Sequence, residues 1–337
     1  MRFLEVAELK QLLGSPKKIV ITTHHKPDGD AMGSSLGLYN YLIQKKHDVT
    51  VVTPNDFPAF LQWLPGVNKV VDFEQQPELA EKFVVEAEIV FHLDFNIPKR
   101  VEKFEPVLLK ATGKKVLIDH HLDPTDFCDF TYSYPEACAT CELIYDFIIS
   151  LDDKAFITKE VAECLYTGIM TDTGSFRFSS MKAHTHRIIA DLIDCGAENH
   201  KIHEAVYDNN SEARLRFLGY CLSKKLKVIP ELKAAYMTIS KAELEAYNHQ
   251  TGDTEGIVNY ALGIAGIRIA AFFAERKNEI KISFRSKGDF SVKELAEKYF
   301  QGGGHKSAAG GRSDLSLEET ARKFEEILPL YREELGA

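Results

Sequence analysis

Titratable side chains directly follow an apolar stretch near the middle of this 337-residue sequence. Residues 116–118 are typical of a buried strand, and Asp119, His120 and His121 come immediately after them. Because open α/β sheets bind ligands at the carboxyl ends of their strands, this tripeptide indicates a functional site. Taken alone, however, an Asp-His-His tripeptide is a weak motif, and a strand that ends in a polar loop is an equally good interpretation.

A similar arrangement occurs near the N-terminus with tighter spacing. The β-branched stretch 18–23 predicts a strand, and residues 31–46 have the spacing of a helix. The turn between them holds His24, Asp28 and Asp30. One Asp could serve only as the N-cap of the helix, but two carboxylates and an imidazole are more than capping needs. The motif therefore predicts metal ligands.

Two more carboxylates stand at the ends of predicted elements. Asp94 follows the buried-type strand 88–93, and Asp172 follows the predicted helix 158–170. The helix dipole disfavours an Asp at a helix C-terminus unless a cation lies nearby. His92 precedes Asp94 by two residues and so lies on the same face. We interpret His92 as structural, with a supporting role beside the site as the alternative.

If the N-terminal half forms one parallel sheet, these polar strand ends meet at a single edge. Carboxylates gathered there repel one another unless cations intervene. Carboxylate and imidazole ligands without thiolates favour Mn²⁺ or Mg²⁺, with Fe, Co and Zn as alternatives. So many ligands indicate two ions about 3.5–4 Å apart, an arrangement suited to phosphoester hydrolysis. The candidate residues are His24, Asp28, Asp30, Asp94, Asp119, His120, His121 and Asp172.

The elements that would position these residues divide into two parts, since the chain is too long for one core of usual size. An amphipathic helix is expected at 3–13, and strands then alternate with helices, which predicts an α/β domain with a parallel sheet. From Leu226 onward, paired strands predict a smaller α/β domain, with a cleft between the two domains. The predicted divisions are a domain at 1–195, a helical linker at 196–225 and a substrate-binding domain at 226–337.

Composition and charge narrow the class of protein. Hydrophobic residues make up 45% and charged residues 27%, as in globular proteins, and no apolar stretch approaches the roughly 20 residues of a membrane span. Charged residues interrupt the N-terminus, so no signal peptide is expected and a reducing cytoplasm is favoured. Cys138 and Cys141 lack the second ligand pair that a zinc site needs, and we interpret both as helix-packing residues.

The net charge of −9 is unevenly distributed. Residues 221–337 carry 18 Lys and Arg against 17 Asp and Glu, which leaves 23 against 33 for residues 1–220. A protein that binds long nucleic-acid duplexes would have a basic surface, and neither part provides a strong one. The acidic N-terminal part suits a site that collects metal cations.

A glycine cluster is the main feature of the C-terminal part. It precedes the small-residue stretch 306–311, which we interpret as helix-like, and backbone N–H groups in such a place can approach an anion closely. A glycine cluster alone is weak evidence, but a histidine and a strand-borne arginine add donors. The residues concerned are Gly302, Gly303, Gly304, His305 and Arg285.

Taken together, four motifs resemble those of the DHH phosphoesterase superfamily. They are H-x-x-P-D-G-D-A-x-G-S at residues 24–34, D-H-H at 119–121, T-D-T-G-x-F at 171–176 and G-G-G-H at 302–305. Within the superfamily, the chain is most similar to the bacterial nanoRNase/pAp-phosphatase group, which pairs the DHH domain with a DHH-associated C-terminal domain. The resemblance spans nearly the whole chain.

The resemblance implies a role for each matching residue of the first domain. His24 and Asp28 would bind one manganese ion. The other ion would be bound by Asp30, His120 and Asp172, and Asp94 would bridge the two. His121 would contact the scissile phosphate, and Asp119 would orient one of the histidines.

In the second domain, the resemblance implies residues that hold the other phosphate or the base of the substrate. These are Arg285, the loop of Gly302, Gly303, Gly304 and His305, the turn 253–256 and Asn259.

The expected activity is therefore that of a cytoplasmic phosphodiesterase/phosphatase with two divalent ions, Mn²⁺ first and Mg²⁺ or Co²⁺ as alternatives. It would hydrolyse short single-stranded RNA or DNA oligonucleotides to mononucleotides and 3′-phosphoadenosine 5′-phosphate (pAp) to AMP, without a membrane partner. Few phosphate contacts suffice for such substrates, which fits the weak basic character. The alternatives are an exopolyphosphatase or pyrophosphatase, a hydrolase of linear dinucleotides from cyclic-dinucleotide signalling, and a non-catalytic nucleotide sensor. A homodimer is one of the oligomeric states left open.

Overall fold

The computed structural model describes residues 6–250, 252–277 and 279–336, and it divides into two compact units. Unit 1 comprises residues 1–209 and unit 2 comprises residues 210–337, so the division falls inside the predicted linker. The first helix, α1, spans Val6–Leu12, and residues 3–5 of the predicted helix lie outside the described part. None of the described helices is both long enough and apolar enough to cross a bilayer.

Unit 1 is built on a six-stranded sheet in the order β3-β2-β1-β4-β5-β6, and every pair of neighbouring strands is parallel, as predicted. The strand order reverses between β1 and β4, and ligands of such sheets bind outside the carboxyl ends at that reversal. The strands are β1 (Lys18–Thr22), β2 (Asp48–Thr53), β3 (Val70–Asp72), β4 (Ile89–Leu93), β5 (Lys114–Asp119) and β6 (Phe130–Ser133).

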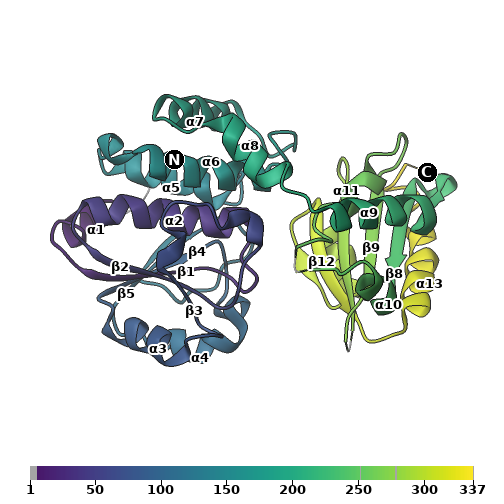
Figure 1. Cartoon of the computed structure of the whole chain (residues 1–337), viewed down its shortest axis with the longest axis horizontal. Coiled ribbons are helices and arrows are strands. Elements are labelled where there is room, and N and C mark those ends of the chain that lie inside the picture. Colours follow the sequence, from purple (N-terminus) through teal and green to yellow (C-terminus); the bar gives the residue numbers. More distant parts are fainter. Residues whose placement is uncertain (1–5, 251, 278, 337) are drawn as a thin grey trace. The chain divides into compact units, whose positions relative to one another are not determined.

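Helices cover both faces of this sheet (Figure 1). On one side, α2 (Gly29–Gln44) and α5 (Thr140–Ser150) contact the strands, and α6 (Lys159–Asp172) packs against both helices. Two further helices, α7 (Ala183–Asp194) and α8 (Asn199–Tyr207), pack on α6. The other face packs against α3 (Pro77–Glu86), the 3₁₀ segment Pro98–Phe104 and α4 (Glu105–Leu108). Because both faces are buried, the strands are continuously apolar, as in β4, where all five residues are buried.

Two parts of unit 1 differ from the sequence-based expectation. The sequence analysis assigned no element to residues 67–87, where the structure has β3 and α3. The spacing of apolar residues over 101–110 also predicts a single helix there. Instead, Glu102 takes a positive φ of 49°, and Pro106 lies in the first turn of the short helix α4, since proline lacks the N–H that would continue a preceding helix.

The backbones of α2 and α6 approach each other closely at two glycines. A Cβ atom on Gly33 would lie 2.6 Å from the carbonyl oxygen of Cys164. One on Gly168 would lie 3.1 Å from Cα of Asp30 in α2 and 2.1 Å from Sγ of Cys141 in α5. Only glycine fits at such positions. Cys141 is a buried free thiol beside both glycines, and Cys138 is a buried free thiol that donates to Glu142 of α5, as the packing interpretation expects.

Unit 2 has a six-stranded mixed sheet in the order β11-β12-β10-β9-β8-β7, antiparallel except for the parallel pair β8 and β9. The strands are β7 (Leu226–Ile229), β8 (Ala234–Ile239), β9 (Ile269–Glu275), β10 (Ile280–Ser286), β11 (Gly303–Gly304) and β12 (Ala308–Ser313). One face packs on α9 (Glu212–Tyr220), the π-helical turn Cys221–Lys225, α10 (Lys241–Ala246) and α11 (Ile257–Leu262). The other packs on α12 (Val292–Tyr299) and α13 (Leu317–Ile327).

The helix-like interpretation of residues 306–311 was wrong. This stretch enters strand β12, which pairs with β10 on one side and with β11 on the other. A Cβ atom on Gly302 would lie 2.0 Å from the carbonyl oxygen of Gly310, so small residues here serve the close pairing of strands. No helix N-terminus therefore follows the glycine cluster in the described residues.

Candidate metal centre

Three neighbouring strands of unit 1 deliver polar side chains to one point at the carboxyl edge of the sheet. His24 comes two residues after β1, Asp94 follows β4, and His120 follows β5. The Nε2 atom of His24 lies 3.4 Å from Oδ2 of Asp94, and the Nε2 atom of His120 lies 3.5 Å from Oδ1 of Asp94. All three side chains are at least nine-tenths buried. Asp94 thus lies at the strand-order reversal, between the two histidines.

Two helices complete the group of carboxylates. Asp28 precedes α2 and caps it, since its Oδ1 atom accepts the backbone N–H groups of Asp30 and Ala31. Asp28 therefore caps α2 with one oxygen, and its second oxygen is not used by the cap. Asp172 is the last residue of α6. The glycine contacts between α2 and α6 bring this end of α6 beside Asp30.

Side chains in this region form three groups whose potential ligand atoms lie within 4.8 Å of one another. The groups are His24, Asp28 and Asp94; Asp30, His120 and Asp172; and Asp94, Asp119 and His121. The eight candidates of the sequence analysis are therefore brought together in unit 1.

The spacing of these atoms fits shared cations better than direct hydrogen bonds. Nε2 of His120 lies 3.6 Å from Oδ2 of Asp172 and 3.8 Å from Oδ2 of Asp30, beyond the usual hydrogen-bond distance of about 2.7–3.2 Å. Two ligand atoms each about 2.1 Å from one ion lie roughly 3.0–3.6 Å apart, depending on the coordination angle. The donor set and its spacing therefore fit divalent ions.

The two histidines are oriented as metal ligands usually are. Nδ1 of His24 lies 2.9 Å from the carbonyl oxygen of His25, and Nδ1 of His120 lies 3.3 Å from that of Ala137. Because a carbonyl oxygen accepts the Nδ1 hydrogen, the lone pair of the neutral ring is on Nε2, which points to the carboxylates.

His121 has a different partner. Its Nδ1 atom lies 2.7 Å from Oδ1 of Asp119, and its backbone N–H donates to Oδ2 of the same carboxylate at 3.1 Å. Asp119 is fully buried, so this carboxylate fixes the ring of His121. The Nε2 atom of His121 is then turned away from Asp119.

The charges of the centre perturb one another strongly. Burial, together with the charges of Asp94 and Asp172, raises the pKa of Asp30 well above its usual value. Burial alone would lower the pKa of His120, but the carboxylates of Asp172, Asp94 and Asp30 outweigh it and raise this pKa to about 9. Burial likewise opposes ionisation of Asp94, but His24, His121 and His120 hold its pKa below the usual range. Without cations, protons must balance the charge of this buried cluster.

The backbone of Asp94 is also unusual. Its φ of 64° lies in the left-handed region, which non-glycine residues rarely adopt. Such strained conformations cluster at functional sites, where the surrounding structure holds them.

In unit 2, the predicted substrate residues lie on adjoining strands. Arg285, on β10, is directly opposite Ala308 of β12, and β12 continues the hairpin that carries Gly302, Gly303, Gly304 and His305. The backbone N–H of His305 donates to the carbonyl of Ala308 at 2.7 Å. Asn259 lies on α11, whose apolar side packs on this same sheet.

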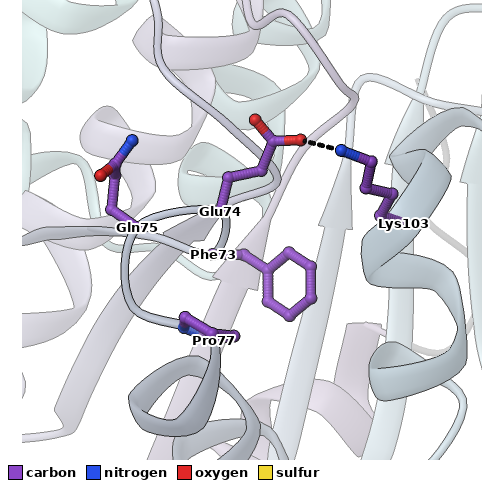
Figure 2. Close-up of a pocket in the computed structure, with 5 residues that line it drawn as sticks. All are labelled: Phe73, Glu74, Gln75, Pro77 and Lys103. Carbon is purple, nitrogen blue, oxygen red and sulfur yellow. Dashed lines mark hydrogen bonds and ion pairs between the residues drawn. The ribbon is translucent and has the colours of Figure 1, made fainter.

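A separate hollow lies between the end of β3 and the 3₁₀ segment Pro98–Phe104 (Figure 2). Its lining residues are Phe73, Glu74, Gln75, Pro77 and Lys103. Lys103 and Glu74 form an ion pair of 2.9 Å on its upper side. None of the eight candidate residues lines this hollow.

Sequence reasoning missed the residues that hydrogen-bond to the candidate ligands and hold them in place. Thr140 and Cys141, at the start of α5, contact Asp30, and Thr140 also contacts Asp94. In the sequence, the only local feature of Thr140 is its place in the first turn of a helical stretch, and threonines are common at such positions. His92 contacts the rings of Phe95 and Phe127, which supports the structural interpretation.

A doubly wound parallel sheet with histidines and carboxylates gathered at its switch point defines a class of metal-dependent hydrolases. The chain belongs to the DHH family. The family model described as the DHH family, N-terminal domain, matches residues 18–169, and the DHHA1 domain model matches residues 233–336.

Individual relatives cover nearly the whole chain. The bifunctional oligoribonuclease and PAP phosphatase NrnA of Thermus thermophilus is 31% identical over 98% of this chain and 93% of its own length. The crystal structure of an exopolyphosphatase-related protein from Bacteroides fragilis is 39% identical, with a TM-score of 0.95 over 99% of this chain and 98% of that one. Exonuclease RecJ bound to manganese is 15% identical, with a TM-score of 0.51 over 99% and 94%, which shows the shared fold alone.

Proposed function

We propose that this chain is a phosphoesterase with two divalent ions, preferably Mn²⁺, that hydrolyses short oligoribonucleotides to mononucleotides and pAp to AMP. The observation that carries the proposal is the position of Asp94, whose two carboxylate oxygens face two different histidines. Each histidine belongs to its own group of potential ligands, so the cluster is suited to two ions and not one. The relatives named for both activities span the same two domains.

The proposed ligands are His24 and Asp28 for one ion and Asp30, His120 and Asp172 for the other, with Asp94 shared. Such a pair of ions lowers the pKa of a water molecule and stabilises charge on the oxygens of a phosphoryl group.

His121 is proposed to contact the scissile phosphate. Asp119 accepts the Nδ1 hydrogen of His121, so Nε2 is the atom left to meet the substrate.

The second domain is proposed to bind the rest of a short substrate. Arg285 supplies a guanidinium, the hairpin of Gly302, Gly303, Gly304 and His305 supplies backbone N–H groups and an imidazole, and Asn259 supplies an amide. A dinucleotide or pAp needs only a few such contacts. In this proposal, residues 1–195 bind the metal ions, residues 196–225 form a helical linker and residues 226–337 bind the substrate. Six free cysteines support a reducing cytoplasm as the site of action.

The second candidate function is hydrolysis of polyphosphate, which the name of the Bacteroides fragilis protein suggests. A groove that binds polyphosphate needs many positively charged side chains. Residues 221–337 carry only one more Lys or Arg than Asp and Glu. We therefore favour nucleotide substrates.

The deciding experiment measures turnover of labelled two- to five-nucleotide RNAs, pAp, a linear dinucleotide and polyphosphate, each with Mn²⁺, Mg²⁺ or Co²⁺ added. We expect fast hydrolysis of the short RNAs and pAp with Mn²⁺, and none after chelation. Preferential cleavage of polyphosphate would overturn the proposal in favour of the alternative. Nucleotide binding without any cleavage would indicate a sensor.

A further inference from the structure

One short segment, residues 137–141, contacts three of the proposed metal ligands from the side of the protein interior. The carbonyl of Ala137 faces Nδ1 of His120 at 3.3 Å. The backbone N–H groups of Thr140 and Cys141 donate to the two oxygens of Asp30, at 2.6 and 2.9 Å. The third ligand is Asp94, which the hydroxyl of Thr140 contacts. The three ligands come from α2, the end of β4 and the end of β5, so this segment links elements that are far apart in the sequence.

Thr140 makes two of these contacts by itself. In addition to its backbone bond to Asp30, its hydroxyl donates to Oδ1 of Asp94 at 2.9 Å. Thr140 is completely buried, and its position 46 residues from Asp94 makes this a long-range tertiary contact. Thr140 therefore contacts the shared ligand Asp94 with its hydroxyl and Asp30, a ligand of one proposed ion, with its backbone N–H.

The geometry of these bonds leaves the carboxylates able to bind cations. A carboxylate oxygen has two lone-pair directions, and one hydrogen bond occupies only one of them. Oδ1 of Asp94 is held by Thr140 while it also faces Nε2 of His120, and Oδ2 faces Nε2 of His24. The hydrogen bond from Thr140 therefore fixes the plane of the Asp94 carboxylate. In this orientation, each of the two oxygens faces a different histidine.

The start of α5 is well suited to this task. Thr140 and Cys141 are the first two residues of the helix, whose backbone N–H groups have no partner within the helix. Cys141 is wedged against Gly168 of α6, so the segment has little freedom to shift.

We propose that Thr140 is a positioning residue that sets the orientation of the shared carboxylate Asp94 through its hydroxyl, while its backbone N–H holds Asp30. The role rests on the proposed metal centre. Groups that orient metal ligands typically contribute about 10–100-fold to metal affinity or activity.

The test compares variants that remove only the hydroxyl with one that keeps it. Thr140→Val and Thr140→Ala lose the bond to Asp94, Thr140→Ser retains it, and all three keep the backbone bonds to Asp30. The matched control is Thr167→Val, because Thr167 is also completely buried but its hydroxyl donates only to the carbonyl of Glu163 in its own helix. Calorimetric titration with Mn²⁺, thermal unfolding of the metal-free protein, and kcat and KM for a dinucleotide are measured for each.

We expect Thr140→Val and Thr140→Ala to bind Mn²⁺ about 10–100-fold more weakly and to lose kcat with little change in KM. Thr140→Ser should restore both quantities, and Thr167→Val should match the wild type in both. If a hydroxyl-free variant that unfolds at the wild-type temperature binds Mn²⁺ as tightly as the wild type, the role of Thr140 is overturned and the metal centre stands. If Thr140→Ser is as impaired as Thr140→Val, the role is overturned as well. A wild-type protein that binds no Mn²⁺ overturns the metal centre and this role together.

Discussion

The Nδ1 atom of His121 lies 2.7 Å from the Oδ1 atom of Asp119. The same Asp119 side chain also accepts the backbone N–H of His121, so one buried carboxylate fixes both the ring and the main chain of this histidine. In the D-H-H motif, the first residue thus supports the third. The second residue, His120, faces the carboxylates of Asp30, Asp94 and Asp172. The three residues of one motif therefore have three different surroundings.

The Asp119 contact predicts a catalytic defect without a metal defect. In Asp119→Asn, the side chain no longer offers two carboxylate oxygens to Nδ1 and to the backbone N–H of His121, so the ring is held less firmly. The kcat for a dinucleotide should therefore fall by about 10–100-fold. Mn²⁺ affinity, measured by calorimetry, should stay near the wild-type value. The matched control is Asp129→Asn, which affects a carboxylate at the opposite end of β5 that pairs with Lys114. Loss of Mn²⁺ binding in Asp119→Asn would instead assign Asp119 to the metal site.

The position of Asp94 between two histidines predicts a much larger loss. Asp94→Ala should reduce turnover of two- to five-nucleotide RNAs by at least ~10³, because the shared carboxylate is removed from both proposed ions. Its Mn²⁺ content, measured by elemental analysis, should also fall. Glu88→Gln is the control, since Glu88 lies at the other end of β4 and pairs with Lys17. Near-normal turnover and metal content in Asp94→Ala would remove Asp94 from the site.

The gathering of the eight unit 1 candidates could be predicted from the sequence because its signals are local. An apolar stretch followed by Asp or His can be recognised residue by residue at Asp94 and Asp119, and parallel strands place their carboxyl ends at one edge. The prediction of Asp172 required one more inference. The helix dipole disfavours an Asp at a helix C-terminus, so its position there indicates a site only if a cation lies nearby.

What could not be predicted depends on contacts that are distant in the sequence. The hydroxyl of Thr140 reaches Asp94 across 46 positions, and its N–H reaches Asp30 across 110. Strand β3 is only three residues long and has one buried residue, so its pattern is too short to identify. Residues 306–311 contain alanine and glycine, whose weak hydrophobic pattern allowed a helical interpretation that pairing with β10 overrides.

The raised pKa of His120 predicts how metal affinity depends on pH. Burial opposes protonation of this ring, but Asp172, Asp94 and Asp30 together raise its pKa to about 9, above the 6.5 of a free imidazole. The metal-free protein therefore holds a proton on His120 below pH 9, and a bound ion must displace it. Mn²⁺ affinity should rise as the pH increases toward 9. Calorimetry in buffers of different ionisation enthalpy should detect proton release at pH 7, and affinity independent of pH between 6 and 8 would contradict this.

The same shift predicts a change in stability of the metal-free protein. Because the folded-state pKa is the higher one, the protonated ring stabilises the fold fully below pH 6.5, and this contribution is lost as the pH rises through about 9. Urea unfolding of the chelated protein should show a decreasing free energy of unfolding over that range. In His120→Asn this decrease should be smaller, and an identical decrease would assign it to other groups.

The contact at Gly168 predicts that packing and metal binding are coupled. In Gly168→Ala, the new methyl group would lie 2.1 Å from Sγ of Cys141 and 2.9 Å from Oδ1 of Asp30. Overpacking of this kind should lower the free energy of unfolding by about 1–3 kcal/mol and weaken Mn²⁺ binding. Gly219→Ala is the control, since Gly219 is helical with no atom near the added carbon, and it should stabilise the protein by about 0.5–1 kcal/mol. Unchanged Mn²⁺ affinity in Gly168→Ala would show that α6 and Asp30 adjust independently.

His92 offers a contrast to the histidines of the centre. Both of its ring nitrogens are buried without a hydrogen-bond partner in the described part of the chain, and burial, reinforced by the charge of Lys115, lowers its pKa to about 3. A neutral, unpartnered imidazole in an apolar place costs stability that an apolar side chain of similar size does not. His92→Leu should therefore raise the free energy of unfolding by about 1 kcal/mol and leave turnover unchanged. His120→Leu, which removes a proposed ligand, should abolish Mn²⁺ binding in the same assays. A drop in turnover for His92→Leu would contradict the structural interpretation and place His92 in support of Asp94.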